Sequence, residues 1–217
     1  MPAFIYLASQ SPRRSQLLTQ LGIAHTLLLA DPQEDAEALE AHLAGERPLD
    51  YVQRVTRLKL EAALQRLQAR GLPPAPVLCA DTTVALGETI YAKPQDAEDA
   101  VRMLSALSGQ THAVLTAVAI GTAAQCEQAC SVSDVTFAAM SEAEIRAYVE
   151  SGEPMGKAGA YAVQGKAAAH ITRINGSYTG IMGLPVELVY KMLRGKVPLN
   201  WTPSPEEGAF SSQKIGK

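Results

Sequence analysis

Residues 7–18 read LASQSPRRSQLL, and the rest of the chain is organised around this stretch. The residues just before it, 4–7, are apolar and uncharged, which predicts a buried strand. The leucines near its end recur at spacings of three and four, which places them on one side of a helix. Ser11 suits the N-cap, and Pro12 suits the first helical position, where its missing N–H costs nothing. The stretch therefore predicts a strand, a tight polar turn and a helix.

Two arginines, Arg13 and Arg14, fall in the first turn of this expected helix. The helix macrodipole favours acidic side chains in that turn, so two cations there repel the positive helix end. A phosphate-sized anion would neutralise both, and a helix N-terminus with arginines is suited to bind one. The alternative is that one or both arginines are only solvated, but a pair in this position favours the anion site.

An aspartate interrupts another apolar run. Residues 77–80 read VLCA and lead directly into Asp81, and apolar residues resume at Val84. A carboxylate in such a run is costly to bury unless it is paired or bound to a metal. Three interpretations remain: a turn-forming aspartate, a structural ion pair, or a residue that handles a metal and water. Because the run resumes so soon, we expect Asp81 on a rigid element at a break in the strand.

Bulk composition excludes several classes of protein. The chain has 217 residues, 47% of them hydrophobic and 19% charged, which is ordinary for a globular enzyme. A formal charge of −3 gives no support for nucleic-acid binding, and no apolar run is long enough for a membrane span. The three cysteines and the absence of a signal-peptide pattern predict reduced thiols and a cytoplasmic protein.

Periodicity predicts several further elements. Pro48 opens a helix to about Arg70, because apolar residues recur there every three or four positions. Residues 36–47 are rich in Ala and Glu and predict a short helix or a flap. A strand is expected over residues 168–173, and a final helix over residues 186–193.

Four separate motifs resemble the Maf family of nucleoside triphosphate pyrophosphatases. They are SQSPRRSQLL at residues 9–18, ADTTV at 80–84, KP at 93–94 and EPMGKAGAYAVQG at 153–165. The chain departs from the family pattern at Ala92, where Glu is usual, and at Gly156, where Asp is usual.

The resemblance implies a fold and a domain plan. The fold class is α/β, similar to inosine triphosphate pyrophosphatases: an elongated, mixed, twisted sheet with two lobes around a nucleotide cleft. Residues 1–195 would form this domain, and residues 196–217, with the lone Trp201, would form a C-terminal tail. Dimerisation is an expectation from the family alone.

The resemblance also implies the roles of individual residues. Asp81 matches the family's proposed general base, and Glu34 matches an acidic position of the family pattern. Because Mg²⁺ or Mn²⁺ takes oxygen ligands, Glu34 and Asp81 are the candidate ligands of a divalent cation. The substrate is a nucleoside triphosphate, attacked by water at its α-phosphorus. The positions that match phosphate-binding residues are Ser9, Arg13, Arg14, Lys59 and Lys93.

Substrate preference is implied by three positions. Arg13, Thr82 and Gln164 match the branch of the family that resembles dTTP/UTP pyrophosphatases, whereas the 7-methyl-GTP branch differs there. A carboxamide such as that of Gln164 offers donors and an acceptor to the pairing edge of a pyrimidine. The alternative to an enzyme is a nucleotide-binding regulator of cell division with weak or no catalysis.

Overall fold

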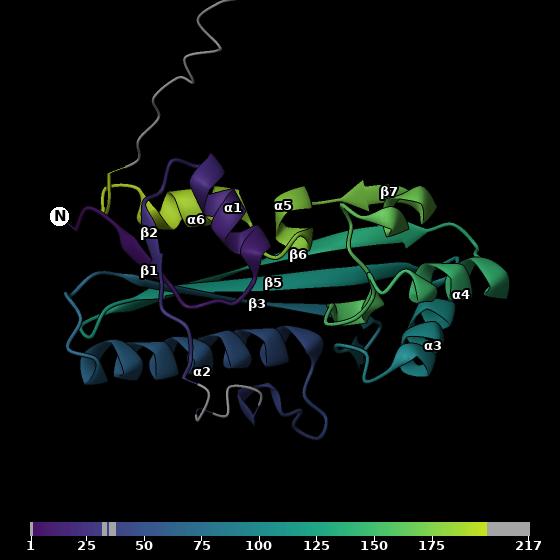
Figure 1. Ribbon diagram of the computed structural model, residues 1–217, viewed down its shortest axis with the longest axis horizontal. Coiled ribbons are helices and arrows are strands. Elements are labelled where there is room, and N and C mark those ends of the chain that lie inside the picture. The colour runs from purple at the N-terminus through teal and green to yellow at the C-terminus, as the bar shows by residue number, and fades with distance from the viewer. Residues whose placement is uncertain (1, 32–33, 35–37, 199–217) are drawn as a thin grey trace, which may run out of the picture.

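A seven-stranded mixed sheet forms the centre of the computed structural model, which describes residues 2–31, 34 and 38–198. The strand order is β2-β1-β3-β5-β6-β7, and β4 pairs with β3 alone (Figure 1). The strands are β1 (Ile5–Leu7), β2 (His25–Leu27), β3 (Val77–Leu86), β4 (Thr89–Tyr91), β5 (Thr111–Gly121), β6 (Cys126–Phe137) and β7 (Ile171–Asn175).

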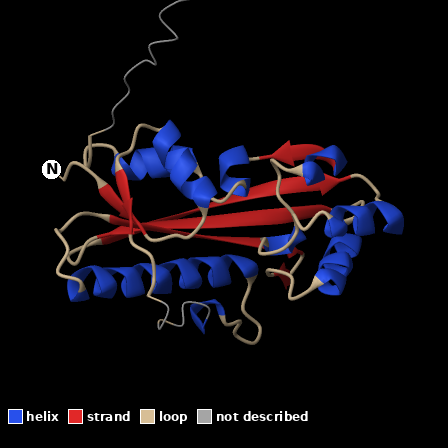
Figure 2. Cartoon of the chain, viewed as in Figure 1, coloured by secondary structure: helices blue, strands red, loops and turns tan. Residues whose placement is uncertain are grey.

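Strand direction follows from the connections. β1 runs parallel to β2 and β3, because helices lie between these strands in the chain. The other neighbours, β3 to β7, are antiparallel. The long β3, β5 and β6 carry the sheet along the length of the molecule (Figure 2). The predicted α/β class with an elongated mixed sheet is confirmed.

Helices cover the sheet on both faces. α2 lies along one face, α1 and α6 lie on the opposite face near β1, and α3 and α4 pack at the far end (Figure 1). The helices are α1 (Pro12–Gln20), α2 (Pro48–Ala69), α3 (Ala97–Leu107), α4 (Glu142–Glu150), α5 (Tyr178–Ile181) and α6 (Val186–Leu193), with 3-10 turns at Ala38–Glu40, Ala158–Ala160 and Lys166–His170.

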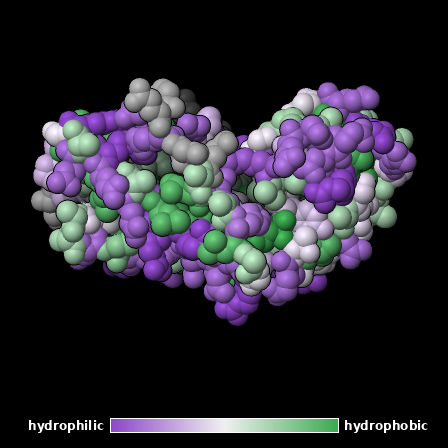
Figure 3. Space-filling model, turned by 90° about the horizontal axis from the view of Figure 1, so that it is seen from below, coloured by the Kyte–Doolittle hydropathy of each residue, from purple (hydrophilic) through white to green (hydrophobic). Residues whose placement is uncertain are grey.

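Alternation along β3 connects the two covered faces. Leu78 packs in the cluster that holds α1 and α6, whereas its neighbours Val77 and Cys79 pack against α2. Successive side chains of a strand point to opposite faces, so β3 serves both layers at once. Seen from the side of α2, the outline is notched between two thicker parts (Figure 3).

Several sequence predictions are confirmed by the elements. Ser11 is the N-cap of α1 with Pro12 at the helix start, α2 begins at Pro48, and α6 spans the predicted final helix. Within the described ranges, no helix is both long and apolar enough to span a membrane. Most of the predicted tail, including Trp201, lies outside the described residues.

Two sequence predictions are wrong. The strand is not interrupted at Asp81, because β3 continues through it from Val77 to Leu86. The predicted strand at 168–173 begins only at Ile171, since Lys166–His170 forms a 3-10 turn. Three consecutive alanines precede His170, and alanine favours helical over extended backbone.

Candidate active site

The site lies where one edge of β3 loses its strand partners. On that edge β3 pairs with β1 at Val77 and Leu78, and with β4 from Val84 onward. The other edge pairs with β5 without interruption, which keeps the backbone extended. Residues 79–83 are therefore rigid but have no described strand beside them on the first edge. Side chains from both faces of the sheet can meet in this gap.

From the face of α1, Arg14 reaches into the gap. Its guanidinium donates to the Ser9 Oγ at 3.0 Å, to the Thr82 Oγ1 at 3.4 Å and to the Gly183 carbonyl at 2.8 Å. Burial lowers the pKa of Arg14, and the charge of Asp81 partly opposes this. An arginine remains protonated even so. The half-buried, charged guanidinium of Arg14 is thus held by neutral acceptors among the described residues.

The turn before α6 supplies backbone carbonyls to both Arg13 and Arg14. The Met182 carbonyl accepts from the Arg13 Nε at 3.4 Å, beside the Gly183 carbonyl that binds Arg14. Gly183 has a φ of +113°, a conformation that side chains with a Cβ rarely adopt. A glycine at this position permits the turn that places both carbonyls beside the arginines.

A third cation, Lys157, faces the same cavity as Arg13 and Arg14. Burial lowers the pKa of Lys157, and the charge of Arg13 lowers it further. Its ammonium donates to the Glu153 carbonyl at 2.5 Å. Among the described residues, none of the three cations forms an ion pair with a carboxylate. We call Arg13, Arg14 and Lys157 the unpaired cations.

From the opposite face, α2 brings Lys59 to Asp81. The Lys59 Nζ lies 2.5 Å from the Asp81 Oδ1, and the Asp81 side chain is only 12% exposed. The other oxygen, Oδ2, accepts no hydrogen bond from any residue that the structure describes. Asp81 thus has one oxygen fixed by a lysine and one available to water or a cation.

Glu40 joins this pair to a second lysine. Its Oε1 lies 2.7 Å from the Lys59 Nζ, and its Oε2 lies 3.1 Å from the Lys93 Nζ. Burial opposes ionisation of Glu40, but the two ammonium groups outweigh it and hold the pKa of Glu40 below its ordinary value. Burial likewise opposes the charge of Lys59, and the two carboxylates raise its pKa. We call Lys59 and Lys93 the paired lysines.

These groups line one cavity with a volume of about 1050 Å³. It brings together residues that are distant in the sequence. Gln164 does not line the cavity and is exposed, although its neighbour Val163 lines it. The site residues predicted from the sequence that line it are Ser9, Arg13, Arg14, Glu34, Lys59, Asp81, Thr82 and Lys93.

Glu34 lines the cavity but is held by Arg66 of α2. The Arg66 Nε lies 2.8 Å from Oε1, and the Arg66 Nη2 lies 2.5 Å from Oε2. The hydrogen bonds from Arg66 lower the pKa of Glu34 to about 2. Both carboxylate oxygens are therefore engaged, and Glu34 must exchange Arg66 for any cation beside Asp81.

The donor set fits a hard divalent cation. Asp81 offers one carboxylate oxygen, Oδ2, that accepts no hydrogen bond from a described residue. The described residues contain no group of three or more His, Cys, Asp or Glu side chains placed to hold a metal. Mg²⁺ needs only one or two carboxylates when water and phosphate oxygens complete its shell. The residues present therefore suit a cation that arrives with a phosphate ligand.

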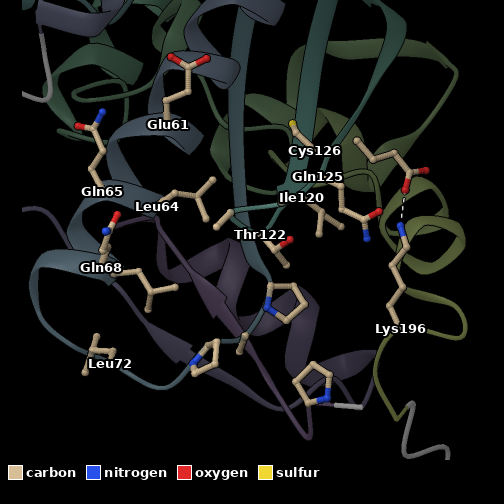
Figure 4. Close-up of a pocket in the computed structure, with 18 residues that line it drawn as sticks. Glu61, Leu64, Gln65, Gln68, Leu72, Ile120, Thr122, Gln125, Cys126 and Lys196 are labelled. Atoms are coloured by element: carbon tan, nitrogen blue, oxygen red, sulfur yellow. Dashed lines mark hydrogen bonds and ion pairs between the residues drawn. The ribbon is translucent and has the colours of Figure 1, made fainter.

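A second cavity, of about 1110 Å³, lies between the end of α2 and the turn from β5 to β6. Figure 4 shows Leu64, Leu72 and Ile120 on its walls, with Lys196 at one side. Lys196 forms an ion pair with Glu127. This cavity is lined mainly by apolar residues and by the amides of glutamines, and it holds no described cation without a carboxylate partner.

Glu40 and Lys157 were missed by the sequence reasoning. Glu40 lies in an Ala- and Glu-rich stretch whose composition does not distinguish one glutamate from another. Lys157 lies within a motif that resembles the family, where its flanking glycines gave a signal of a close turn. His112 of β5 lies outside this cavity, and its Nε2 lies 2.8 Å from the Tyr161 hydroxyl.

An α/β chain with a cation-lined cleft at a gap in its sheet is suited to a polyphosphate ligand. The chain matches the family model described as Maf-like protein over residues 4–196, and it belongs to that family. A relative from Albidiferax ferrireducens, named dTTP/UTP pyrophosphatase, is 67% identical over 86% of this chain and 93% of its own length. One from Polaromonas sp. with the same name is 60% identical over 89% and 97%.

Among solved structures, the Ham1 protein of Staphylococcus aureus is similar to this chain. The matched region covers 62% of this chain and 71% of the Ham1 chain, with 13% sequence identity and a TM-score of 0.41.

Proposed function

We propose that this protein is a nucleoside triphosphate pyrophosphatase that converts dTTP and UTP to the monophosphate and pyrophosphate. The observation that carries the proposal is the convergence of Arg13, Arg14, Lys59, Lys93 and Asp81 on one cavity. The names of the relatives from Albidiferax and Polaromonas support the choice of substrate.

Phosphate binding is assigned to both groups of cations. A helix end supplies only about half an elementary charge, so side chains and a divalent cation must neutralise most of a triphosphate. The unpaired cations Arg13, Arg14 and Lys157 have no carboxylate partner among the described residues and would take phosphate directly. Ser9 positions Arg14 through the 3.0 Å hydrogen bond to its guanidinium. Lys59 and Lys93 would stabilise charge on the leaving pyrophosphate.

Asp81 would act as the general base. Lys59 fixes its Oδ1, and Oδ2 is left to orient a water molecule and receive its proton. A divalent cation bound here supplies Lewis-acid activation, since it acidifies water and neutralises phosphate charge. Asp81 would hold that cation together with phosphate oxygens. Glu34 stays a predicted second ligand of this cation, and it can bind the cation only when its carboxylate leaves Arg66.

Base preference is assigned to Arg13, Thr82 and Gln164. Thr82 lies within the cavity, where its Oγ1 contacts the Thr116 hydroxyl at 3.0 Å as well as Arg14. Gln164 would have to move inward to meet a base. The methyl group that distinguishes the two pyrimidines is worth only about 1–3 kcal/mol, so both dTTP and UTP should be accepted.

A nucleotide panel tests the proposal. Purified protein with Mg²⁺ or Mn²⁺ should release pyrophosphate from dTTP and UTP and much less from 7-methyl-GTP. In ¹⁸O-labelled water the label should appear in the monophosphate, because the attack is on the α-phosphorus. A preference for 7-methyl-GTP would overturn the substrate assignment, and release of inorganic phosphate alone would overturn the reaction.

Location and assembly extend the proposal. All three cysteines, Cys79, Cys126 and Cys130, are free, which suits a reducing cytoplasm. We also propose a single catalytic domain over residues 1–195 and keep a homodimer as the family expectation. Sedimentation of the purified protein tests the second point.

A further inference from the structure

The cavity contains two kinds of cation, and only one kind is ready for an anion. Arg13, Arg14 and Lys157 have no described carboxylate partner, whereas Lys59 and Lys93 share Glu40. Glu40 therefore puts negative charge where phosphate oxygens would approach both lysines. Like charges repel, so a phosphate at these lysines must first weaken the contacts of Glu40.

The backbone of Glu40 is fixed by α2. The Tyr51 hydroxyl donates to the Glu40 carbonyl at 2.9 Å, and the Arg54 Nη2 donates to the next carbonyl, that of Ala41, at 2.8 Å. Arg54 also forms an ion pair with Glu46 farther along the segment, at 2.6 Å. These contacts hold the carboxylate near the lysines, so its contact with them is built into the fold.

We propose that Glu40 is a specificity-determining residue that competes with substrate phosphates for the paired lysines. The inference rests on the proposed function. A monophosphate would bind the unpaired cations and leave Glu40 in place. A ligand with two or more linked phosphates carries enough charge to displace it. After cleavage, the return of Glu40 to Lys59 and Lys93 would expel pyrophosphate.

The arithmetic of competition gives the sign of the effect. When a site is open for only part of the time, the apparent dissociation constant is the intrinsic one divided by the open fraction. Removing the charge of Glu40 should therefore tighten the binding of any ligand that needs the paired lysines. A Glu40 that only positioned these lysines for phosphate would give the opposite result, weaker binding after its removal.

Calorimetric titration of the full chain with inorganic pyrophosphate, at low salt in EDTA, measures this directly. Glu40→Gln should bind pyrophosphate about fivefold or more tightly than the parent protein. Tyr51→Phe, which removes one of the contacts that fix the segment, should change affinity in the same direction by a smaller factor. Glu187→Gln is the matched control, because it removes the same charge from an exposed pair with Lys191.

A second readout separates this inference from the proposed function. In steady-state assays, the inhibition constant of pyrophosphate should fall for Glu40→Gln, while that of the monophosphate dTMP should stay within about twofold. Unchanged or weaker pyrophosphate binding by Glu40→Gln would overturn the role of Glu40. A parent protein that hydrolyses no nucleotide would instead overturn the proposed function, and the calorimetry would still report on Glu40.

Discussion

The two cavities of this protein have nearly the same volume, about 1050 and 1110 Å³, but opposite chemistry. One lies at the gap in β3, and its lining includes three cations, Arg13, Arg14 and Lys157, that have no carboxylate partner among the described residues. The other lies beside the end of α2 and is lined mainly by leucines, prolines and amides (Figure 4). Volume alone would slightly favour the second as the binding site.

Charge and desolvation decide between them. A guanidinium partly withdrawn from water without an ion pair to a described carboxylate is costly, and Arg14 is half-buried in this state. That expense is offset when an anion binds, which is typical of functional sites. The apolar cavity contains no described cation without a carboxylate partner, so it carries no comparable desolvation cost. Its walls continue the core cluster that includes Leu67. The comparison makes predictions for substitutions on each side.

The largest effect is expected for Asp81→Asn. The amide cannot take a proton from water, and a positioned general base contributes about 10²–10⁴-fold. Turnover of dTTP should fall to below a few per cent, while nucleotide affinity, measured by calorimetry without divalent cations, stays largely intact. Substantial residual turnover by the variant would show that Asp81 is not the general base.

A smaller loss is expected for Arg14→Met. Hydrogen bonds to charged groups are worth about 1.5–3 kcal/mol each, so kcat/KM for dTTP should fall about 10- to 100-fold. Arg102→Met is the matched control, because Arg102 is exposed on α3 and pairs with Asp99. Equal kcat/KM for the two variants would contradict the assignment of Arg14 to phosphate binding.

In the apolar cavity, Leu67→Ala should affect stability and not activity. Leu67 of α2 is 9% exposed and packs in the core between this helix and the sheet. Its truncation should lower the free energy of unfolding by about 2–3 kcal/mol. Urea titration measures this loss. At a temperature where the variant is folded, kcat/KM should stay within about twofold of the parent, and a tenfold loss would assign this cavity a part in catalysis.

The smallest effect is expected for Lys196→Met at the same cavity. Its ion pair with Glu127 is exposed, and such pairs contribute about 0–1 kcal/mol. Both the unfolding free energy and the affinity for pyrophosphate should stay nearly unchanged. A clear loss of pyrophosphate affinity would show that the second cavity also takes phosphate.

The sequence predicts local structure well where local chemistry determines it. The start of α1 at Ser11 and Pro12 follows from backbone requirements at a helix end, and α2 follows from its apolar spacing. The residues predicted for the charged cavity came from the resemblance to the family, whereas Glu40 and Lys157 were not predicted. The break predicted at Asp81 was wrong because only pairing with the neighbouring β5 shows that the strand continues.

Tertiary contacts explain what the sequence left open. Glu34 meets Arg66, and Glu40 meets Lys59 and Lys93, across sequence separations that no spacing rule covers. Each pairing depends on how the segment before α2 lies on that helix. The exposure of Gln164 likewise follows from the turn that buries its neighbour Val163.

The most direct test of the central claim is a crystal structure of the protein with Mg²⁺ and a dTTP analogue whose α,β-bridging oxygen is replaced by an imido group. The account predicts that the phosphates contact Arg14 and Lys93 at the gap in β3, with the α-phosphorus beside Asp81. An analogue bound in the cavity of Leu64 and Ile120, or with its phosphates away from these cations, would contradict it.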